Sequence, residues 1–181
     1  RYISPSELLA RMAVDTTVSV WDDHSALERR LASHPQVSAV RIERKLPGTL
    51  VVRVTENLPV AFVPSPHGMR AVDEAGRSLP IDASQVSVDL PVVARPDTSL
   101  LQLLADVRAR LPATFDRISD ARRVGDELQL RIAGVMVRGG MDLTADRLAD
   151  ILPVETDLQR RRALVAELDL RFRDQVIARL Q

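Results

Sequence analysis

The spacing of the hydrophobic residues changes at Val37 from a helical pattern to alternation, and this change most constrains the fold. Before it, apolar residues recur every three or four positions, as they do along one face of a helix. After it, residues 40–43 and 50–55 largely alternate between inward and outward positions, which is typical of half-buried strands. The sequence therefore predicts two helices followed by a β-hairpin, with the helices covering one face of the hairpin.

Residues that favour the N-terminal end of a helix mark the start of the first predicted helix. Ser4 is placed as an N-cap, Pro5 follows at the first helical position, and Glu7 stands three residues after the serine. Ile3 is spaced to contact Leu8 across the first turn. Together these residues predict a helix that begins at residue 5.

The second predicted helix begins between residues 22 and 25 and ends before Pro35, because the residue preceding a proline avoids the helical conformation. Between the two predicted strands, residues 46–49 (Leu-Pro-Gly-Thr) favour a type II turn with a positive φ at the glycine. The module defined by these helices and strands ends near Glu56.

Beyond Pro59 the sequence predicts short strands separated by turns, with two further helices. The helices are expected over residues 98–111 and 144–152. The predicted strands are residues 60–63, 69–72, 128–132, 135–137, 168–173 and 176–180. Gly139 and Gly140 are expected to close a hairpin.

The composition argues against several classes of function. Lys and Arg number 25, Asp and Glu number 25, and this zero net charge gives no general electrostatic attraction for nucleic acid or anionic membranes. Aromatic residues make up 3% and leave few platforms for stacking bases. The absence of cysteine removes disulfides, thiolate metal sites and cysteine nucleophiles. No stretch of the sequence is apolar for long enough to span a membrane.

The sequence shows no recognisable catalytic or metal-binding motif. His24, His34 and His67 are not spaced to bind a metal with one another or with a carboxylate, and we expect all three to be solvated. Neither a glycine-flanked serine elbow nor a phosphate-binding loop with its lysine is present. The run of arginines at 160–162 lies near acidic residues and is expected on a solvated helix face. We therefore expect no enzyme activity, no cofactor and no metal.

Strand edges are instead the expected functional surface. A strand at the edge of a sheet exposes unpaired backbone groups that a second chain can complete. The hairpin over residues 37–54 and the closing segment over residues 168–180 are the two candidates.

Six segments distributed over nearly the whole chain resemble the FtsQ/DivIB family of bacterial cell-division proteins. The segments are residues 3–9 (ISPSELL), 34–40 (HPQVSAV), 44–54 (RKLPGTLVVRV), 56–61 (ENLPVA), 72–76 (VDEAG) and 168–176 (LDLRFRDQV). The first four resemble the POTRA domain of that family. The last two resemble its Val-Asp-x-x-Gly turn and its Asp-Leu-Arg strand.

The resemblance implies an α+β protein with two domains. Residues 1–57 would be a POTRA-type module of two helices on a small sheet, its first strand truncated, and residues 58–181 an FtsQ-type β domain of antiparallel strands with flanking helices. It also implies a single-pass protein of the inner membrane at the division septum. Because the chain begins at Arg1 without a methionine, we expect a cytoplasmic tail and a transmembrane helix upstream, and this part of the protein on the periplasmic side.

In function, the resemblance implies a noncatalytic scaffold with protein partners and no nucleic acid. Members of the family link the small division proteins FtsB and FtsL to the division machinery, and they help to recruit and control the septal peptidoglycan synthases FtsW and FtsI. An alternative is a POTRA module of an outer-membrane assembly or secretion pore, which would bind extended polypeptides by strand addition. Such modules usually occur as tandem repeats, whereas this chain contains one.

The motif over residues 168–176 also implies where partners bind. The strand from Asp169 to Phe172 is expected to bind FtsB by strand addition, with Arg171 and Phe172 as anchors, because arginine and large aromatic residues are favoured there. The alternation of Phe172 with Leu168 leaves open that Phe172 lies in the core. The candidate partner-binding residues are Asp169, Leu170, Arg171, Phe172, Val176 and Arg138.

Overall fold

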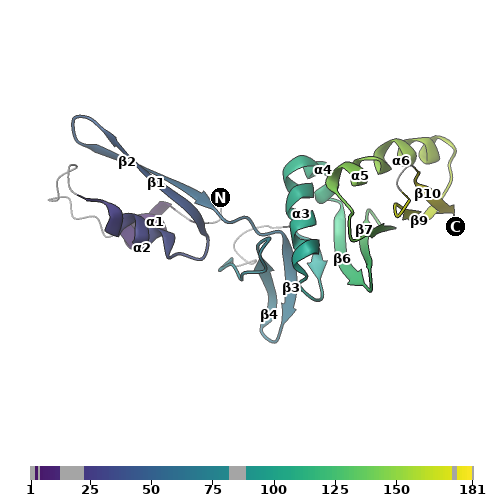
Figure 1. Cartoon of the computed structure of the whole chain (residues 1–181), viewed down its shortest axis with the longest axis horizontal. Helices are drawn as coiled ribbons and strands as arrows, with labels where there is room; N and C mark the ends of the chain where they lie inside the picture. The colour runs from purple at the N-terminus through teal and green to yellow at the C-terminus, as the bar shows by residue number, and fades with distance from the viewer. Residues whose placement is uncertain (1–2, 4, 13–22, 82–88, 173–174, 181) are drawn as a thin grey trace. The chain divides into compact units, whose positions relative to one another are not determined.

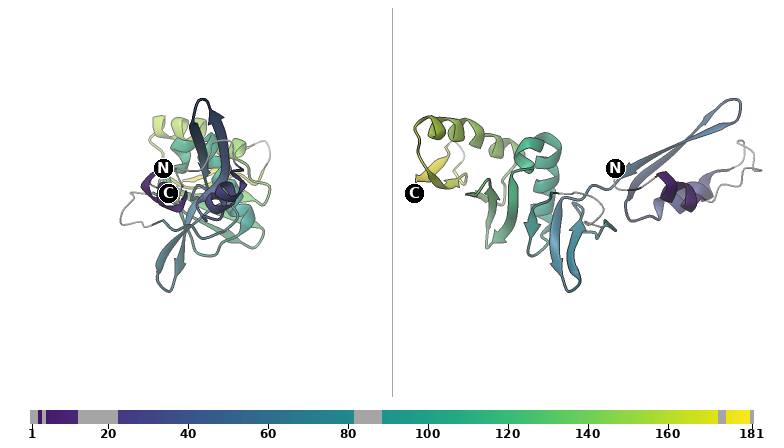
Figure 2. Two further views of the ribbon diagram at one scale, coloured as in Figure 1. Left: turned by 90° about the vertical axis from the view of Figure 1, so that its left-hand side faces the viewer. Right: turned by 180° about the vertical axis from the view of Figure 1, so that it is seen from behind.

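The structure is a computed structural model that describes residues 3, 5–12, 23–81, 89–172 and 175–180. The chain divides into two compact units, of which the first comprises Arg1–Leu58 with Leu79–Val86 and the second Pro59–Ser78 with Ser87–Gln181. Each unit contains helices and strands (Figures 1 and 2), so the predicted α+β class is confirmed.

The first unit has the predicted order of two helices and a hairpin. Helices α1 (Pro5–Met12) and α2 (Ser25–Ala32) precede strands β1 (Val37–Lys45) and β2 (Thr49–Glu56), which pair antiparallel. The proposed cap Ser4 lies outside the described residues. Leu31 of α2 is fully buried, and Figure 1 shows the helices along one side of the hairpin.

Two local predictions in this unit are wrong. The turn between β1 and β2 is not type II, because the Leu46–Pro47 peptide is cis and Gly48 does not have the positive φ that a type II turn requires. His34 is buried, not solvated, and its Nδ1 accepts a hydrogen bond of 3.0 Å from the backbone N–H of Gln36. This bond gives the buried Nδ1 atom a hydrogen-bond partner at the point where the chain passes from α2 to β1.

The second unit is built on an eight-stranded sheet with the order β10-β9-β8-β7-β6-β5-β3-β4. Its strands are β3 (Ala61–Ser65), β4 (Gly68–Val72), β5 (Val92–Val93), β6 (Ile118–Val124), β7 (Glu127–Ile132), β8 (Val135–Gly140), β9 (Val165–Asp169) and β10 (Ile177–Leu180). The pairs β3·β5, β5·β6 and β8·β9 are parallel and the others are antiparallel. Strands β4 and β10 therefore form the two edges.

Helices cover one face of this sheet and leave the other polar. The helices are α3 (Thr98–Arg110), α4 (Pro112–Phe115), α5 (Ala145–Ala149) and α6 (Ile151–Arg160). Along β7, Leu128 and Leu130 are buried, whereas Arg131 on the opposite face is exposed. The predicted helix over residues 98–111 is confirmed, and the side chain of Asp97 caps it by accepting a hydrogen bond from the N–H of Leu100 at 3.1 Å.

The region after β8 departs from prediction in its helices. A single helix was expected over residues 144–152, but α5 is followed directly by α6, which continues to Arg160. Pro153 is compatible with α6 because it lies in the first turn, where a backbone N–H has no helical acceptor. The arginines at 160–162 thus begin at the end of α6.

Gly139 and Gly140 do not close a hairpin, as was expected, but lie within β8. They pair with Leu128 and Glu127 of β7, and the turn between β7 and β8 falls at residues 133–134, both with positive φ. A Cβ atom at Gly139 would lie 2.6 Å from a methyl carbon of Leu143, so this position has no space for a side chain. None of the helices in the described ranges has the length and hydrophobicity of a membrane span.

Candidate partner-binding edge

The segment that was predicted to form one partner-binding strand is divided by the structure. Strand β9 ends at Asp169 and is paired on both sides, with β8 and with β10, so it cannot accept a further strand. Leu170 follows β9, is buried, and donates its N–H to the carbonyl of Arg138 at 2.8 Å. The strand available at this end of the sheet is therefore β10.

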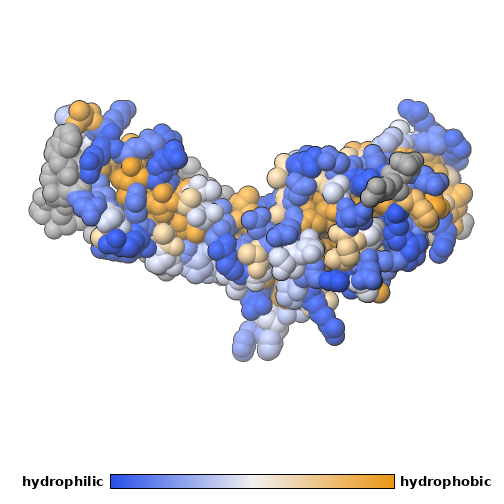
Figure 3. All heavy atoms as spheres, in the orientation of Figure 1, coloured by the Kyte–Doolittle hydropathy of each residue, from blue (hydrophilic) through white to orange (hydrophobic). Residues whose placement is uncertain are grey.

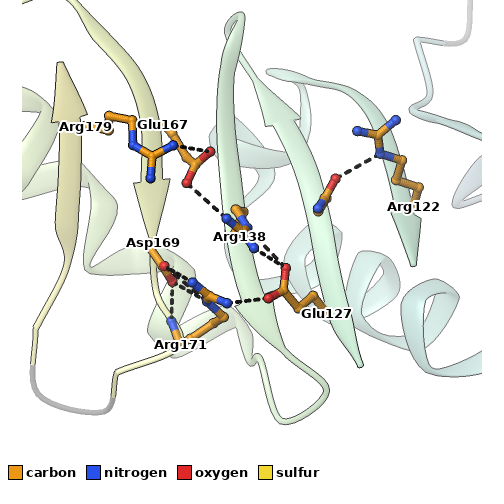
Figure 4. Close-up of polar contacts among 8 residues, drawn as sticks. Arg122, Glu127, Arg138, Glu167, Asp169, Arg171 and Arg179 are labelled. Atoms are coloured by element: carbon orange, nitrogen blue, oxygen red, sulfur yellow. Dashed lines mark hydrogen bonds and ion pairs between the residues drawn. The ribbon is translucent and has the colours of Figure 1, made fainter. Parts of the chain in front are cut away.

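Charged side chains from four neighbouring strands meet on the helix-free face of the sheet (Figure 4). We call this group the charge ladder; it consists of Glu127, Arg138, Glu167, Asp169, Arg171 and Arg179. Arg138 of β8 lies between acids of both neighbouring strands, with Nη2 2.6 Å from Glu127 Oε2 and Nη1 3.3 Å from Glu167 Oε1. The positive charge of Arg138 is therefore balanced by a carboxylate from β7 and a carboxylate from β9.

Arg171 is the second centre of the charge ladder. Its Nε donates to Asp169 Oδ1 at 2.9 Å, its Nη2 donates to Asp169 Oδ2 at 2.5 Å, and its Nη1 pairs with Glu127. Arg171 was expected to be a free partner anchor, but two carboxylates of its own chain hold it. Its replacement would therefore disturb the fold as well as any contact to a partner.

Hydrogen bonding stabilises the charged forms of four members of the charge ladder. The Arg138 guanidinium holds the pKa of Glu127 below its ordinary value, and Arg171 does the same to the pKa of Asp169. The same bonds raise the pKa values of Arg138 and Arg171. These two acids and two arginines therefore remain charged at neutral pH.

Phe172 and Val176 lie in the segment that connects β9 to β10. Phe172 is 45% exposed, so it is not a core residue, and Val176 is half-buried. Arg147 of α5 fixes this segment, because its Nη2 donates to the carbonyl oxygens of Phe172 at 2.6 Å and Gln175 at 3.1 Å. The backbone of Phe172 is thus tied to α5, and its aromatic side chain stays partly exposed.

Strand β10 exposes apolar side chains at the end of the sheet. Ile177 is 45% and Leu180 54% exposed, and Figure 3 shows hydrophobic surface at the C-terminal end of the molecule, where Figure 1 places β10. An apolar groove of about 250 Å³ runs beside β9 and includes Leu158, Val165 and Leu168 among its lining residues. Exposed apolar side chains on an unpaired edge are features of a surface that a second chain covers.

The structure brings three of the six predicted residues into one cluster and separates the rest. Arg138, Asp169 and Arg171 meet in the charge ladder, whereas Phe172 and Val176 lie on the connecting segment and Leu170 is buried. Sequence reasoning missed Glu127, Glu167 and Arg179, which complete the charge ladder. No local pattern could have found them, because the contacts depend on the register among β7, β8, β9 and β10.

The remaining described residues provide no competing metal site. Within the ranges that the structure describes, no group of three or more His, Asp or Glu side chains could hold a metal ion. The polar chemistry on these residues consists mainly of arginine–carboxylate pairs that neutralise each other.

Comparisons with known proteins identify the family. Residues 1–57 match the POTRA domain, FtsQ-type. The chain is 30% identical over 179 residues to the cell division protein FtsQ of Thioalkalivibrio sp., covering 95% of this chain and 73% of that protein. It is 29% identical to FtsQ of Myxococcus fulvus, covering 90% of this chain and 62% of that protein.

Among solved structures, the major extracytoplasmic domain of the cell division protein DivIB from Geobacillus stearothermophilus is similar, with a TM-score of 0.41 and 21% identity over 59% of this chain and 97% of that chain. The FtsQ-type POTRA match and the identity to FtsQ proteins, which extends through the sheet that carries the charge ladder, lead to one conclusion: the chain belongs to the FtsQ/DivIB family of bacterial cell-division proteins.

Proposed function

We propose that this chain is the extracytoplasmic part of a noncatalytic division scaffold that binds FtsB, and with it FtsL, by strand addition to β10. The observation that carries the proposal is the exposed edge strand with apolar side chains, which ends the eight-stranded sheet. An extended partner would gain main-chain hydrogen bonds along β10 and would cover Ile177 and Leu180.

The environment of β10 supports this mode of binding. Among the residues that the structure describes, β10 pairs with β9 alone, so its outer backbone groups face away from the sheet. Val176 immediately precedes β10, and Phe172 is a second partly exposed apolar residue in the segment before it that a partner could contact. The role proposed for Arg138, Asp169, Leu170 and Arg171 is to hold β9 and the connecting segment in the geometry that presents this edge.

The wider role is proposed from the family. The chain would help to recruit and control the septal synthases FtsW and FtsI, and a transmembrane helix upstream of this segment would anchor it in the inner membrane at the septum. Residues 1–57 would serve as the POTRA domain and residues 58–181 as the β domain. The alternative of an outer-membrane assembly or secretion pore has no support, because the POTRA match is FtsQ-type and the relatives are cell division proteins.

The test is a titration of this chain with the extracytoplasmic segment of FtsB from the same organism, followed by calorimetry. Single prolines at Ile177, Ala178 and Arg179 remove one backbone donor each, and alternate residues of an edge strand point their donors outward. We expect saturable binding by the unmodified chain and its loss in at least one proline variant that retains the unmodified melting temperature. Absence of binding at high micromolar concentration would contradict the proposal.

A further inference from the structure

We propose that the strand added to β10 carries an acidic residue beside Arg179 on the helix-free face and an apolar residue beside Ala178 on the opposite face. This inference rests on the proposed function and specifies the chemistry of the partner segment. It follows from the order of charges in the charge ladder and from the two faces of β10.

The charges of the charge ladder alternate from strand to strand. Glu127 of β7 is followed by Arg138 of β8, then by Glu167 and Asp169 of β9, and then by Arg179 of β10. These side chains lie on one face because they occupy paired or alternate positions along the strands (Figure 4). A further strand beside β10 would continue the alternation with a negative charge.

Arg138 shows what a completed position in this series looks like. Its guanidinium contacts an acid of the strand on each side, Glu127 and Glu167, and its side chain is 24% exposed. Arg179 has Glu167 on its β9 side, but that ion pair spans 3.9 Å and the Arg179 side chain is 73% exposed. Within the described part of the chain, Arg179 therefore has an acid on its β9 side and none on the side that would face the added strand, whereas Arg138 has an acid on both sides.

The opposite face of β10 calls for an apolar residue. Ala178 pairs with Leu168, and cross-strand partners place their side chains on the same face. Leu168 is fully buried and lines the groove beside β9. A partner residue next to Ala178 would therefore extend an apolar surface, where a charge would be desolvated without a partner.

These two faces together fix the register of the partner strand. A slip by one residue would move the acidic side chain from Arg179 to the apolar face and would expose the apolar residue. The charge at Arg179 therefore contributes to specificity as well as to affinity, since a strand with a basic residue at this position would be repelled.

The experiment compares Arg179→Glu with Arg70→Glu, using the extracytoplasmic FtsB segment of the same organism as the probe. Arg70 is an exposed arginine on β4, the opposite edge of the same sheet, so its replacement makes the same change in net charge at a distance from β10. We expect Arg179→Glu to weaken binding about tenfold, because an attractive cross-strand pair becomes repulsive. Arg70→Glu should bind within twofold of the unmodified chain, and both variants should keep the melting temperature.

A charge-reversal series in the probe completes the test. Each acidic residue of the FtsB segment is replaced in turn by arginine, and one of these replacements should restore binding to Arg179→Glu while weakening binding to the unmodified chain. Equal affinities of the two arginine variants, or a binding segment without an acidic residue, would overturn this inference and leave the proposed function intact. Failure of the unmodified chain to bind the segment would instead overturn the proposed function.

Discussion

The two edge strands of the eight-stranded sheet are anchored in opposite ways. Strand β4 pairs with β3 over five positions, and its last two residues, Ala71 and Val72, are buried. Val72 also forms a bridge with Ser78, and its carbonyl accepts a hydrogen bond from Val60 at 2.8 Å. Strand β10 has no buried residue in its four positions and pairs with β9.

This difference shows how one sheet can have a partly buried edge strand, β4, and an exposed edge strand, β10. We call them the closed edge and the open edge. The chain itself covers the end of β4 at Ala71 and Val72, which reduces the tendency of that part of the edge to pair with another molecule. Strand β10 is held by main-chain bonds to β9 and by the segment that Arg147 fixes, so its own side chains contribute little to the core. The fold therefore holds β10 in place while its side chains stay exposed.

The largest effect is expected at Leu168 in β9, the strand that supports β10. Leu168 is fully buried, and Leu168→Ala should lower the free energy of unfolding by about 3 kcal/mol through lost burial and a residual cavity. Urea denaturation followed by circular dichroism measures this loss. A loss below about 1 kcal/mol would mean that β9 is as weakly anchored as β10.

A smaller loss is expected at the closed edge. Val72 is fully buried, so Val72→Ala should lower the free energy of unfolding by about 2 kcal/mol. The same denaturation experiment applies, with Met69→Ala as the control because Met69 is an exposed residue of the same strand. If the two substitutions have equal effects, β4 is not anchored by its buried end and the comparison between the edges fails.

The charge ladder should make stability depend on pH in the acid range. The pKa of Asp169 is lowered by its bonds to Arg171, so its contribution is complete above the ordinary value of 3.8 and is lost as the pH falls through the lower folded value. Asp169→Asn should cost about 1–2 kcal/mol at pH 7 and should flatten the decline in melting temperature below about pH 4. Parallel pH profiles of the two proteins would show that Asp169 does not contribute.

The smallest effect on stability is expected at the open edge. Leu180 is more than half exposed, so Leu180→Ala should change the free energy of unfolding by less than about 0.5 kcal/mol. The same substitution should weaken binding of the FtsB segment if β10 is the partner edge. A large loss of stability without a loss of binding would reverse the roles assigned to β4 and β10.

The features that were predictable from sequence are those with a local cause. The alternation after Val37 predicted the β1–β2 hairpin, and the apolar face over residues 98–111 predicted α3. The turn at Leu46–Pro47 was missed because the same residues are compatible with a trans and a cis peptide. The helix expected over residues 144–152 stops short of the end of α6, which continues past Pro153 because a proline in the first turn is tolerated.

The candidate site depended on information that a single strand does not contain. The motif around Arg171 directed the prediction to residues 168–176, but the pairing of Arg171 with Glu127 joins residues 44 positions apart. Such contacts follow from strand order and register, which are set by the packing of the whole sheet. For the same reason, the sequence indicated strand addition without distinguishing β9 from β10.

The close approach of Leu143 to Gly139 has a consequence for how this sequence can change over generations. A Cβ atom at position 139 would meet the Leu143 side chain at 2.6 Å, so Gly139→Ala in the present chain forces that leucine to move. A smaller residue at position 143 would remove the obstruction. Substitutions at the two positions are therefore expected to be coupled. A smaller residue would replace Leu143 before a residue with a side chain replaces Gly139.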